Sequence, residues 1–288
     1  MLAGNQNIMT TLSFELFPPK TDQAMAKVIE TAGILARFHP ETISITYGAG
    51  GSSRARSLEL VAALNKPQYP PISAHITVAG QSREAVTEQM DEWRTHGVRR
   101  FVALRGDMPD MQRPFVPHSD GFTSSLELMR YLRDHGADAI YGGAYPEGHP
   151  ESQSEASELD HLMAKQDAGA TALITQYFFE APVFLRFRDK LVARGITIPI
   201  IPGILPIANF ARALRFSQSC GASVPNQVHD AFKGLEDNPH ESVLVGTAMA
   251  SQLCQELVRE GVSHIHLYTL NRADMSCAIA RTLGRISS

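Results

Sequence analysis

Two kinds of segment alternate along this chain, and they differ in the spacing of their apolar residues. Short runs rich in β-branched and apolar residues end at glycine, proline or charged residues, which is typical of buried strands. Between these runs lie longer stretches with apolar residues three or four positions apart, which predict amphipathic helices. The predicted strands are residues 12–17, 42–47, 73–77, 101–104, 139–145, 171–179, 198–201 and 264–268.

The predicted helices connect these strands one by one. Thr21 or Asp22 is a candidate N-cap of the first helix, and Gly97, Gly169 and Gly195 are candidate stops of later ones. The predicted helices are residues 22–38, 53–64, 82–96, 123–135, 154–168, 181–193, 206–219, 226–260 and 271–283.

This alternation predicts a parallel sheet, because a helical crossover returns the chain to the same end of the sheet. Eight β/α units in roughly 250 residues match the size of a closed barrel. The predicted fold is therefore α/β: a single-domain (β/α)8 TIM barrel over residues 12–288, preceded by a flexible N-terminal tail at residues 1–11. An open doubly wound sheet is the alternative.

Polar residues gather at the carboxyl ends of the predicted strands. In the run 99–108 (RRFVALRGDM), an apolar strand gives way at once to Arg105, Gly106 and Asp107. A charged pair at the end of a buried strand is costly unless something there uses it. Barrel active sites lie at this end of the strands. We therefore expect a shared site for these residues and for Glu15, Thr46, Tyr47, His75, Tyr145, Glu147, His149 and Gln176.

Glu15 is the strongest candidate for acid–base chemistry. Its neighbours Phe14, Leu16 and Phe17 are apolar, and two prolines follow. Such surroundings predict a raised pKa, which suits a general acid. The alternative is a structural ion pair between Glu15 and an arginine such as Arg272.

Arg105 and Asp107 allow two interpretations. They form a salt bridge with each other, or Arg105 binds an anion or a carbonyl-rich ring while Asp107 faces a developing cation. Lys165 lies on the polar helix predicted at residues 154–168. It is interpreted as a solvated lysine unless a phosphate lies near that helix.

Several other motifs fall short of a functional pattern. The loop at residues 48–52 (GAGGS) does not match G-x-G-x-x-G, and no Lys-Ser/Thr pair follows it, so neither a dinucleotide fingerprint nor a P-loop is predicted. His264 and His266 alternate on the last strand and share one face. Without a carboxylate or cysteine at ligand spacing, neither this pair nor His75 and His149 predicts a metal site.

Composition and charge narrow the expected partners and location of the protein. A net charge of −4 does not indicate a nucleic-acid partner, and no apolar run approaches the roughly 20 residues of a membrane span. The first residues lack the basic and apolar regions of a signal peptide. The three cysteines form no C-x-x-C pair and are interpreted as free thiols in a reducing cytosol, so a cytoplasmic location is expected.

Together these segments resemble one family, the flavin-dependent methylenetetrahydrofolate reductases of bacterial type. The resemblance runs in order from about residue 12 to residue 284, where the predicted barrel ends, and the C-terminal regulatory domain of the eukaryotic enzymes is not expected. The matching segments are residues 13–19, 45–49, 74–77, 103–107, 144–150, 167–170, 174–179, 201–206 and 268–273.

The resemblance implies a barrel that holds FAD at the carboxyl ends of its strands. NADH or NADPH would reduce the flavin and leave, and 5,10-methylenetetrahydrofolate would then be reduced to 5-methyltetrahydrofolate in a ping-pong reaction that supplies methyl groups for methionine synthesis. NADH is the favoured donor. Members of this family often form homo-oligomers, so self-association is a further expectation.

The resemblance also implies roles for individual residues. Glu15 matches the general acid that opens the folate ring, and Asp107 matches the carboxylate that stabilises the resulting iminium cation. Gln176 matches a residue that binds both pterin and nicotinamide, Phe216 an aromatic that stacks on them, and Arg272 a substrate contact. Matches to FAD or nicotinamide contacts are Thr46, Tyr47, Ala49, His75, Arg105, Gly106, Tyr145, His149 and Lys165.

Four positions depart from the family pattern. Glu158 stands where an aspartate usually binds the flavin ribose, and His161 and Ala164 replace polar or basic residues near the diphosphate. Arg212 replaces a glutamine near the folate. Glu158 and His161 are still assigned to the cofactor and Arg212 to the substrate. Two alternatives remain: another barrel enzyme, such as a proline dehydrogenase-like flavoprotein or a pteridine-binding transferase, and a non-catalytic flavin-binding protein.

Overall fold

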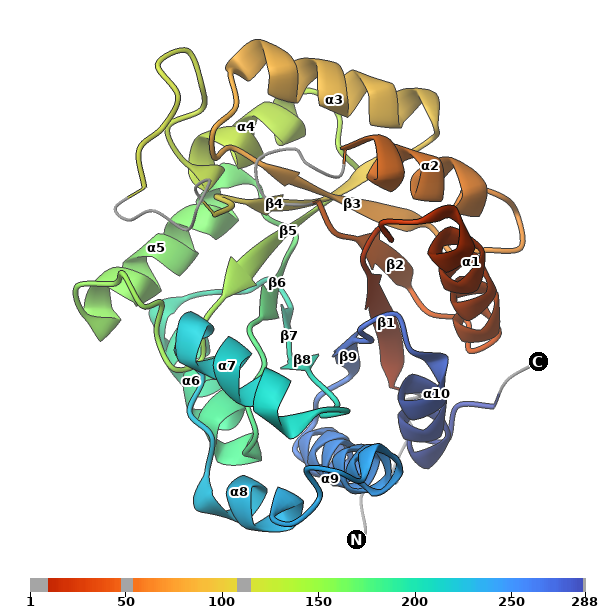
Figure 1. The fold of residues 1–288 in the computed structure, drawn as a ribbon. Helices are drawn as coiled ribbons and strands as arrows, with labels where there is room; N and C mark the ends of the chain where they lie inside the picture. Colours follow the sequence, from red (N-terminus) through yellow and green to blue (C-terminus); the bar gives the residue numbers. More distant parts are fainter. Residues whose placement is uncertain (1–9, 48–53, 108–114, 287–288) are drawn as a thin grey trace, which may run out of the picture.

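The computed structural model describes residues 10–47, 54–107 and 115–286. Within these ranges a ring of strands lies at the centre, and helices surround it (Figure 1). The strands are β1 (Thr11–Leu16), β2 (Thr42–Ile45), β3 (Ile72–Thr77), β4 (Arg100–Leu104), β5 (Ala139–Ala144), β6 (Ala172–Thr175), β7 (Ile200–Ile201), β8 (Gly203–Ile204) and β9 (His264–Tyr268).

The helices of the described residues follow the strands in the expected alternation. They are α1 (Asp22–Ala36), α2 (Arg54–Leu64), α3 (Arg83–Thr95), α4 (Ser125–Asp134), α5 (Glu155–Ala168), α6 (Ala181–Arg194), α7 (Phe210–Cys220), α8 (Asn226–Phe232), α9 (Pro239–Arg259) and α10 (Ala273–Thr282). None of them is both long and apolar enough to cross a membrane.

The parallel strands close into a barrel, as the sequence predicts, and the open-sheet alternative is wrong. The sheet runs in the order β7-β6-β5-β4-β3-β2-β1-β9-β8. Its two end strands are consecutive in the chain and are separated only by Pro202. β7 pairs with β6 and β8 pairs with β9, so one interrupted strand closes the ring. Proline lacks a backbone N–H, which explains why the single predicted strand at 198–201 is divided here.

Local capping fixes most helix ends near their predicted positions. Thr21 and Ser82 cap α1 and α3 through their side chains, and Gly169 ends α5 in the left-handed conformation. Three predicted elements were wrong in their extent. The helix predicted at residues 226–260 is divided into α8 and α9 by residues 233–238, which are not helical. The strand predicted to end at 179 stops at Thr175, and the helix predicted from 206 begins at Phe210, because Asn209 caps that helix.

The two faces of the strands bury different kinds of side chain. Leu12, Phe14 and Leu16 of β1 join the main core between strands and helices. Because side chains alternate along a strand, Ser13 and Glu15 point the other way, into the barrel. The interior is divided: β4 to β7 contribute an apolar cluster there, whereas the interior positions of β1, β2, β3 and β9 are polar. The polar residues are Ser13, Glu15, Thr42, Ser44, Ser73, His75 and His266.

Two helical glycines allow a test of how closely α9 packs on the barrel. A Cβ added to Gly246 in α9 would lie 1.9 Å from the carbonyl oxygen of Ile207, whereas one added to Gly33 in α1 would meet only Tyr69 at 3.9 Å. We expect Gly246→Ala to lower the free energy of unfolding by about 1–3 kcal/mol through overpacking. Gly33→Ala should be neutral or stabilising by up to about 1 kcal/mol. Urea unfolding of both variants checks this, and equal effects would contradict the packing described here.

Candidate active site

A cavity of about 430 Å³ opens at the carboxyl ends of β4 and β5 and against the inner face of α5. It brings the end of β4 together with the loop after β5 and with α5. Each predicted cofactor residue that lines it comes from the end of β4, from the loop after β5 or from α5. These residues are Arg105, Gly106, Asp107, Tyr145, His149, Glu158, His161 and Lys165.

Lys165 is the most buried cation of this cavity. Only 7% of the residue is exposed, and its Nζ donates a hydrogen bond to the Gly143 carbonyl oxygen at 2.6 Å. Burial lowers the pKa of Lys165 to about 8; nearby Arg105 lowers it further, and Glu158 opposes the shift. The interpretation of Lys165 as a solvated lysine was therefore wrong. A buried cation without a paired carboxylate hydrogen bond is suited to receive an anion.

Arg105 pairs with Glu151 and not with Asp107, so the predicted salt bridge between Arg105 and Asp107 is wrong. Arg105 Nη2 donates to Glu151 Oε1 at 3.1 Å as part of a bidentate pair. Asp107 is exposed at the cavity edge. Gly106 between them has a φ of +80°, and an added Cβ would lie 2.8 Å from Thr77 Cβ. The turn that separates the two charged side chains therefore requires glycine.

Two histidines and a tyrosine complete the lining. Burial lowers the pKa of His149, and neighbouring Arg105 adds to this effect. Burial lowers the pKa of His161 to about 4, with a further contribution from Lys165. Tyr145 packs edge-on against His149 with ring centroids 4.6 Å apart, and burial raises the Tyr145 pKa to about 12. Near neutral pH the histidines are therefore neutral hydrogen-bonding groups beside Arg105 and Lys165.

Glu15 lies in the polar half of the barrel interior, between two histidines. Its Oε2 is 3.4 Å from His75 Nε2 and 3.9 Å from His266 Nε2. Burial alone would raise the Glu15 pKa, but hydrogen bonds and charge interactions with His266 and His75 together lower it from 4.5 to about 2. The predicted raised pKa is therefore wrong for this structure. The alternative pairing with Arg272 is also wrong, because Arg272 pairs with Asp274.

Sequence reasoning missed the role of His266 in this site. The alternation of His264 and His266 correctly predicted that both lie on one face of the last strand, and both contact the hydroxyl of Ser13. Their proximity to Glu15 depends on the pairing of β1 with β9 across about 250 residues of chain. The alternation of the two histidines is the signal in the sequence. It is compatible with hydrogen bonding inside the barrel as well as with metal binding.

Other predicted site residues follow β6 and β2. Gln176 follows β6 and lines a small hollow with Tyr145, and its side-chain oxygen accepts from the Tyr177 N–H. Thr46 and Tyr47 follow β2, where Tyr47 is buried against Trp93. Ala49 lies outside the described residues.

The predicted substrate residues Arg212, Phe216 and Arg272 are exposed. The Arg212 guanidinium lies over the Phe216 ring on α7, 5.7 Å from its centroid. Exposure leaves both side chains free to reorient when a ligand binds. Arg272 precedes α10 and is held by Asp274. The structure therefore brings together the predicted cofactor residues more fully than the predicted substrate residues.

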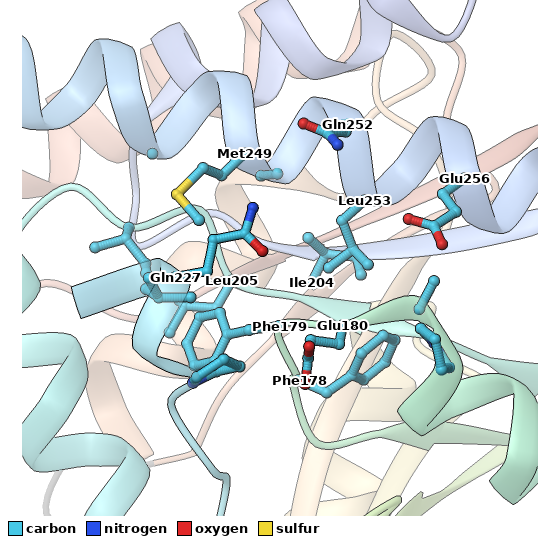
Figure 2. Close-up of a pocket in the computed structure, with 17 residues that line it drawn as sticks. Phe178, Phe179, Glu180, Ile204, Leu205, Gln227, Met249, Gln252, Leu253 and Glu256 are labelled. Atoms are coloured by element: carbon cyan, nitrogen blue, oxygen red, sulfur yellow. The ribbon is translucent and has the colours of Figure 1, made fainter. Parts of the chain in front are cut away.

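A second cavity, of about 300 Å³, contains none of the predicted site residues. Figure 2 shows Met249 and Leu253 of α9 on one side of it and Phe179 and Glu180 of the loop before α6 on the other. It lies between these elements and the end of β8, away from Glu15. Across the residues the structure describes, no group of three or more His, Cys, Asp or Glu side chains could hold a metal ion.

The low pKa of Glu15 has a consequence for stability. A carboxyl whose pKa is lowered on folding stabilises the protein fully above its unfolded pKa, and this contribution is lost as pH falls toward the folded pKa. From about pH 5 to about pH 3, the free energy of unfolding of the wild type should therefore fall by about 2 kcal/mol more than that of Glu15→Gln. Urea titrations at both pH values check this, and parallel losses would contradict the histidine pairing.

Comparisons with a family profile and with individual proteins point to the same family. The sequence profile of the methylenetetrahydrofolate reductase family matches residues 3–284. The chain is 38% identical over 284 residues to the 5,10-methylenetetrahydrofolate reductase of Pectobacterium carotovorum, covering 98% of this chain and 92% of that one. It is also 38% identical over 275 residues to the Escherichia coli protein of the same name, covering 95% and 90%.

More distant proteins extend the comparison. An Arabidopsis thaliana protein named methylenetetrahydrofolate reductase (NADH) 1 is 32% identical over 288 residues, which cover 96% of this chain and 49% of that protein. A solved structure from Clostridium thermocellum, described as binding two copies of 5-methyl-5,6,7,8-tetrahydrofolic acid, superposes with a TM-score of 0.63. It is 15% identical and covers 97% of both chains, so this likeness concerns the fold.

The extent of these matches decides between the alternatives left open by the sequence. The bacterial relatives are matched over nearly their whole length, and they are enzymes by name. A different barrel family and a non-catalytic binding protein are therefore both excluded. The chain belongs to the methylenetetrahydrofolate reductase family of oxidoreductases.

Proposed function

We propose that this enzyme reduces 5,10-methylenetetrahydrofolate to 5-methyltetrahydrofolate with electrons from NADH, which pass through bound FAD in a ping-pong sequence. One observation carries the proposal most directly: a carboxyl group held inside the barrel lies near the carboxyl strand ends that also form a cavity lined by Arg105 and Lys165. The family match supports the substrate, and the names of the plant relatives support NADH over NADPH.

The cavity beside β4 and α5 fits FAD by the chemistry of its donors. Arg105 and Lys165 supply positive charge for a diphosphate, and neutral His149 and His161 supply ring nitrogens for further hydrogen bonds. The buried Glu158 carboxylate, hydrogen-bonded to Ser152, could accept from ribose hydroxyls. FAD bound here would supply hydride transfer between nicotinamide and folate.

Glu15 would govern the proton in this reaction. Breaking the bond between the methylene carbon and N10 of the folate requires a proton at N10 and leaves an iminium cation at N5. Hydride addition to the methylene carbon then gives the methyl group, so the reaction consumes one proton and one hydride. When substrate excludes water from Glu15, desolvation raises the pKa of this carboxyl and favours proton transfer.

The remaining predicted residues would bind the folate, the nicotinamide or the flavin. Asp107 would stabilise the iminium charge, and the neutral amide of Gln176 could hydrogen-bond either pterin or nicotinamide. Phe216 would stack on the ligand, with Arg212 and Arg272 near the charged part of the folate. Thr46, Tyr47, Ala49 and His75 would complete the contacts to FAD or nicotinamide.

The proposed product fits a biosynthetic role. 5-Methyltetrahydrofolate would supply methyl groups for methionine synthesis, and we place this reaction in the cytoplasm, where NADH is available. Self-association of the chain into a homo-oligomer is part of the proposal.

Glu15→Gln tests the proton role by separating the two half-reactions. Flavin reduction by NADH needs no proton from Glu15, whereas reoxidation by methylenetetrahydrofolate should slow by about 10²–10⁴-fold. Rapid-mixing absorbance of the flavin, measured without oxygen, reports each half-reaction separately. Glu256→Gln, in the cavity outside the barrel, is the matched control and should leave both rates unchanged. Equal slowing of both half-reactions by Glu15→Gln would refute the role of proton donor.

A further inference from the structure

A chain of hydrogen-bonding groups leads away from Glu15 through the barrel. His266 Nε2 faces Glu15 Oε2 at 3.9 Å, and His266 Nδ1 is 2.8 Å from Ser13 Oγ. The same hydroxyl is 2.9 Å from Nε2 of His264. A hydroxyl can donate to one partner while it accepts from another, so Ser13 can join the two imidazoles.

The chain of groups runs along the barrel from one end to the other. The register pairs Thr11 with His264, Ser13 with His266, and Glu15 with Tyr268. His264 is therefore at the amino end of the barrel, where β9 begins, and Glu15 is near the carboxyl end. Ser13 and His266 are each 1% exposed, whereas His264 is half-buried. The middle of the path is therefore buried, whereas His264 at the amino end keeps partial exposure.

The proposed function, on which this inference rests, requires a proton to reach Glu15 in each turnover. Each turnover consumes one proton, and Glu15 is ionised near neutral pH before substrate binds. Nicotinamide and folate would both bind over the carboxyl ends of the strands and screen Glu15 from solvent there. A proton that enters from the opposite end of the barrel avoids this obstruction.

We propose that His264, Ser13 and His266 form a proton relay that recharges Glu15 from the amino end of the barrel. A water-derived proton binds Nδ1 of His264, and the Nε2 proton of His264 passes to Ser13 Oγ. The Ser13 hydroxyl proton passes to His266 Nδ1, and the Nε2 proton of His266 passes to Glu15. Each group gains one proton and loses one, and only Glu15 ends with an additional proton.

Two features of the surroundings favour this route. Burial, together with the neighbouring His266, lowers the pKa of His264 to about 4, so His264 is neutral near pH 7 and can accept a proton at Nδ1. The second histidine beside Glu15 shows no comparable route: its Nε2 faces Glu15 Oε2 at 3.4 Å, and within the described ranges no hydrogen bond links His75 to a further group. The 3.9 Å gap from His266 to Glu15 exceeds an N–H···O hydrogen bond by about 1 Å, a distance that a small side-chain movement closes on substrate binding.

Three variants of the FAD-loaded enzyme test the relay. Ser13→Ala breaks the path between the histidines, and His264→Gln keeps a donor near the Nε2 position but cannot pass a proton on. Ser44→Ala is the matched control, because Ser44 lies in the interior of the next strand and its hydroxyl has no hydrogen-bond partner among the described residues. Ser13→Thr retains the hydroxyl and should restore the rate.

The relay predicts that Ser13→Ala and His264→Gln slow flavin reoxidation by methylenetetrahydrofolate by about tenfold or more relative to Ser44→Ala. The solvent deuterium isotope effect on this step should rise in both variants, since proton delivery becomes limiting. If the wild type is reoxidised by the folate but Ser13→Ala behaves like Ser44→Ala, the relay is overturned. If the wild type is reduced by NADH but is not reoxidised by the folate, the proposed function fails instead.

Nitrogen-15 NMR of labelled histidines tests the same path without turnover. The relay requires His264 and His266 to carry protons on Nε2, with His266 Nδ1 accepting from Ser13. Ser13→Ala should shift the His266 Nδ1 resonance, whereas Ser44→Ala should not. A wild-type protein in which His264 carries its proton on Nδ1 instead would contradict the proposed direction of transfer.

Discussion

The site depends on how a carboxylate is held inside the barrel. Glu15 faces His75 and His266, whose hydrogen bonds and charges outweigh the effect of burial on its pKa. The strands that supply these three residues, β1, β3 and β9, also give the barrel interior its polar half. The other half, from β4 to β7, contributes an apolar cluster. This division of the interior places the candidate proton donor, Glu15, on one side of the barrel.

The other side of the site is built from the carboxyl ends of β4 and β5 and from α5. The β4 turn at Gly106 separates Arg105 from Asp107, and α5 presents Lys165 from behind the strands. Arg105 and Lys165 thus line the cavity together with three carboxylates, while Glu15 lies toward the barrel axis. The two groups of residues lie on different strands of one ring: β1, β3 and β9 carry Glu15 and its histidines, and β4 and β5 end at the cavity.

The sequence was sufficient for the fold and for most of the cavity, because both follow from local patterns. Alternating strands and helices predict the barrel, and polar residues at strand ends predict Arg105, Tyr145 and His149 as neighbours. The pKa of Glu15 and the burial of Lys165 were mispredicted because both depend on tertiary contacts. His266 reaches Glu15 only through the pairing of β1 with β9, and the aliphatic stem of Lys165 is covered by packing that the polar helix sequence does not reveal.

The most direct test of this account is an anaerobic double-mixing experiment on the wild-type, FAD-loaded protein. NADH is mixed first, methylenetetrahydrofolate is mixed second, and the visible absorbance of the flavin is followed throughout. The account predicts that NADH bleaches this absorbance, that the folate restores it, and that 5-methyltetrahydrofolate is formed in equal amount. Bleaching by NADH without recovery on addition of the folate would contradict it.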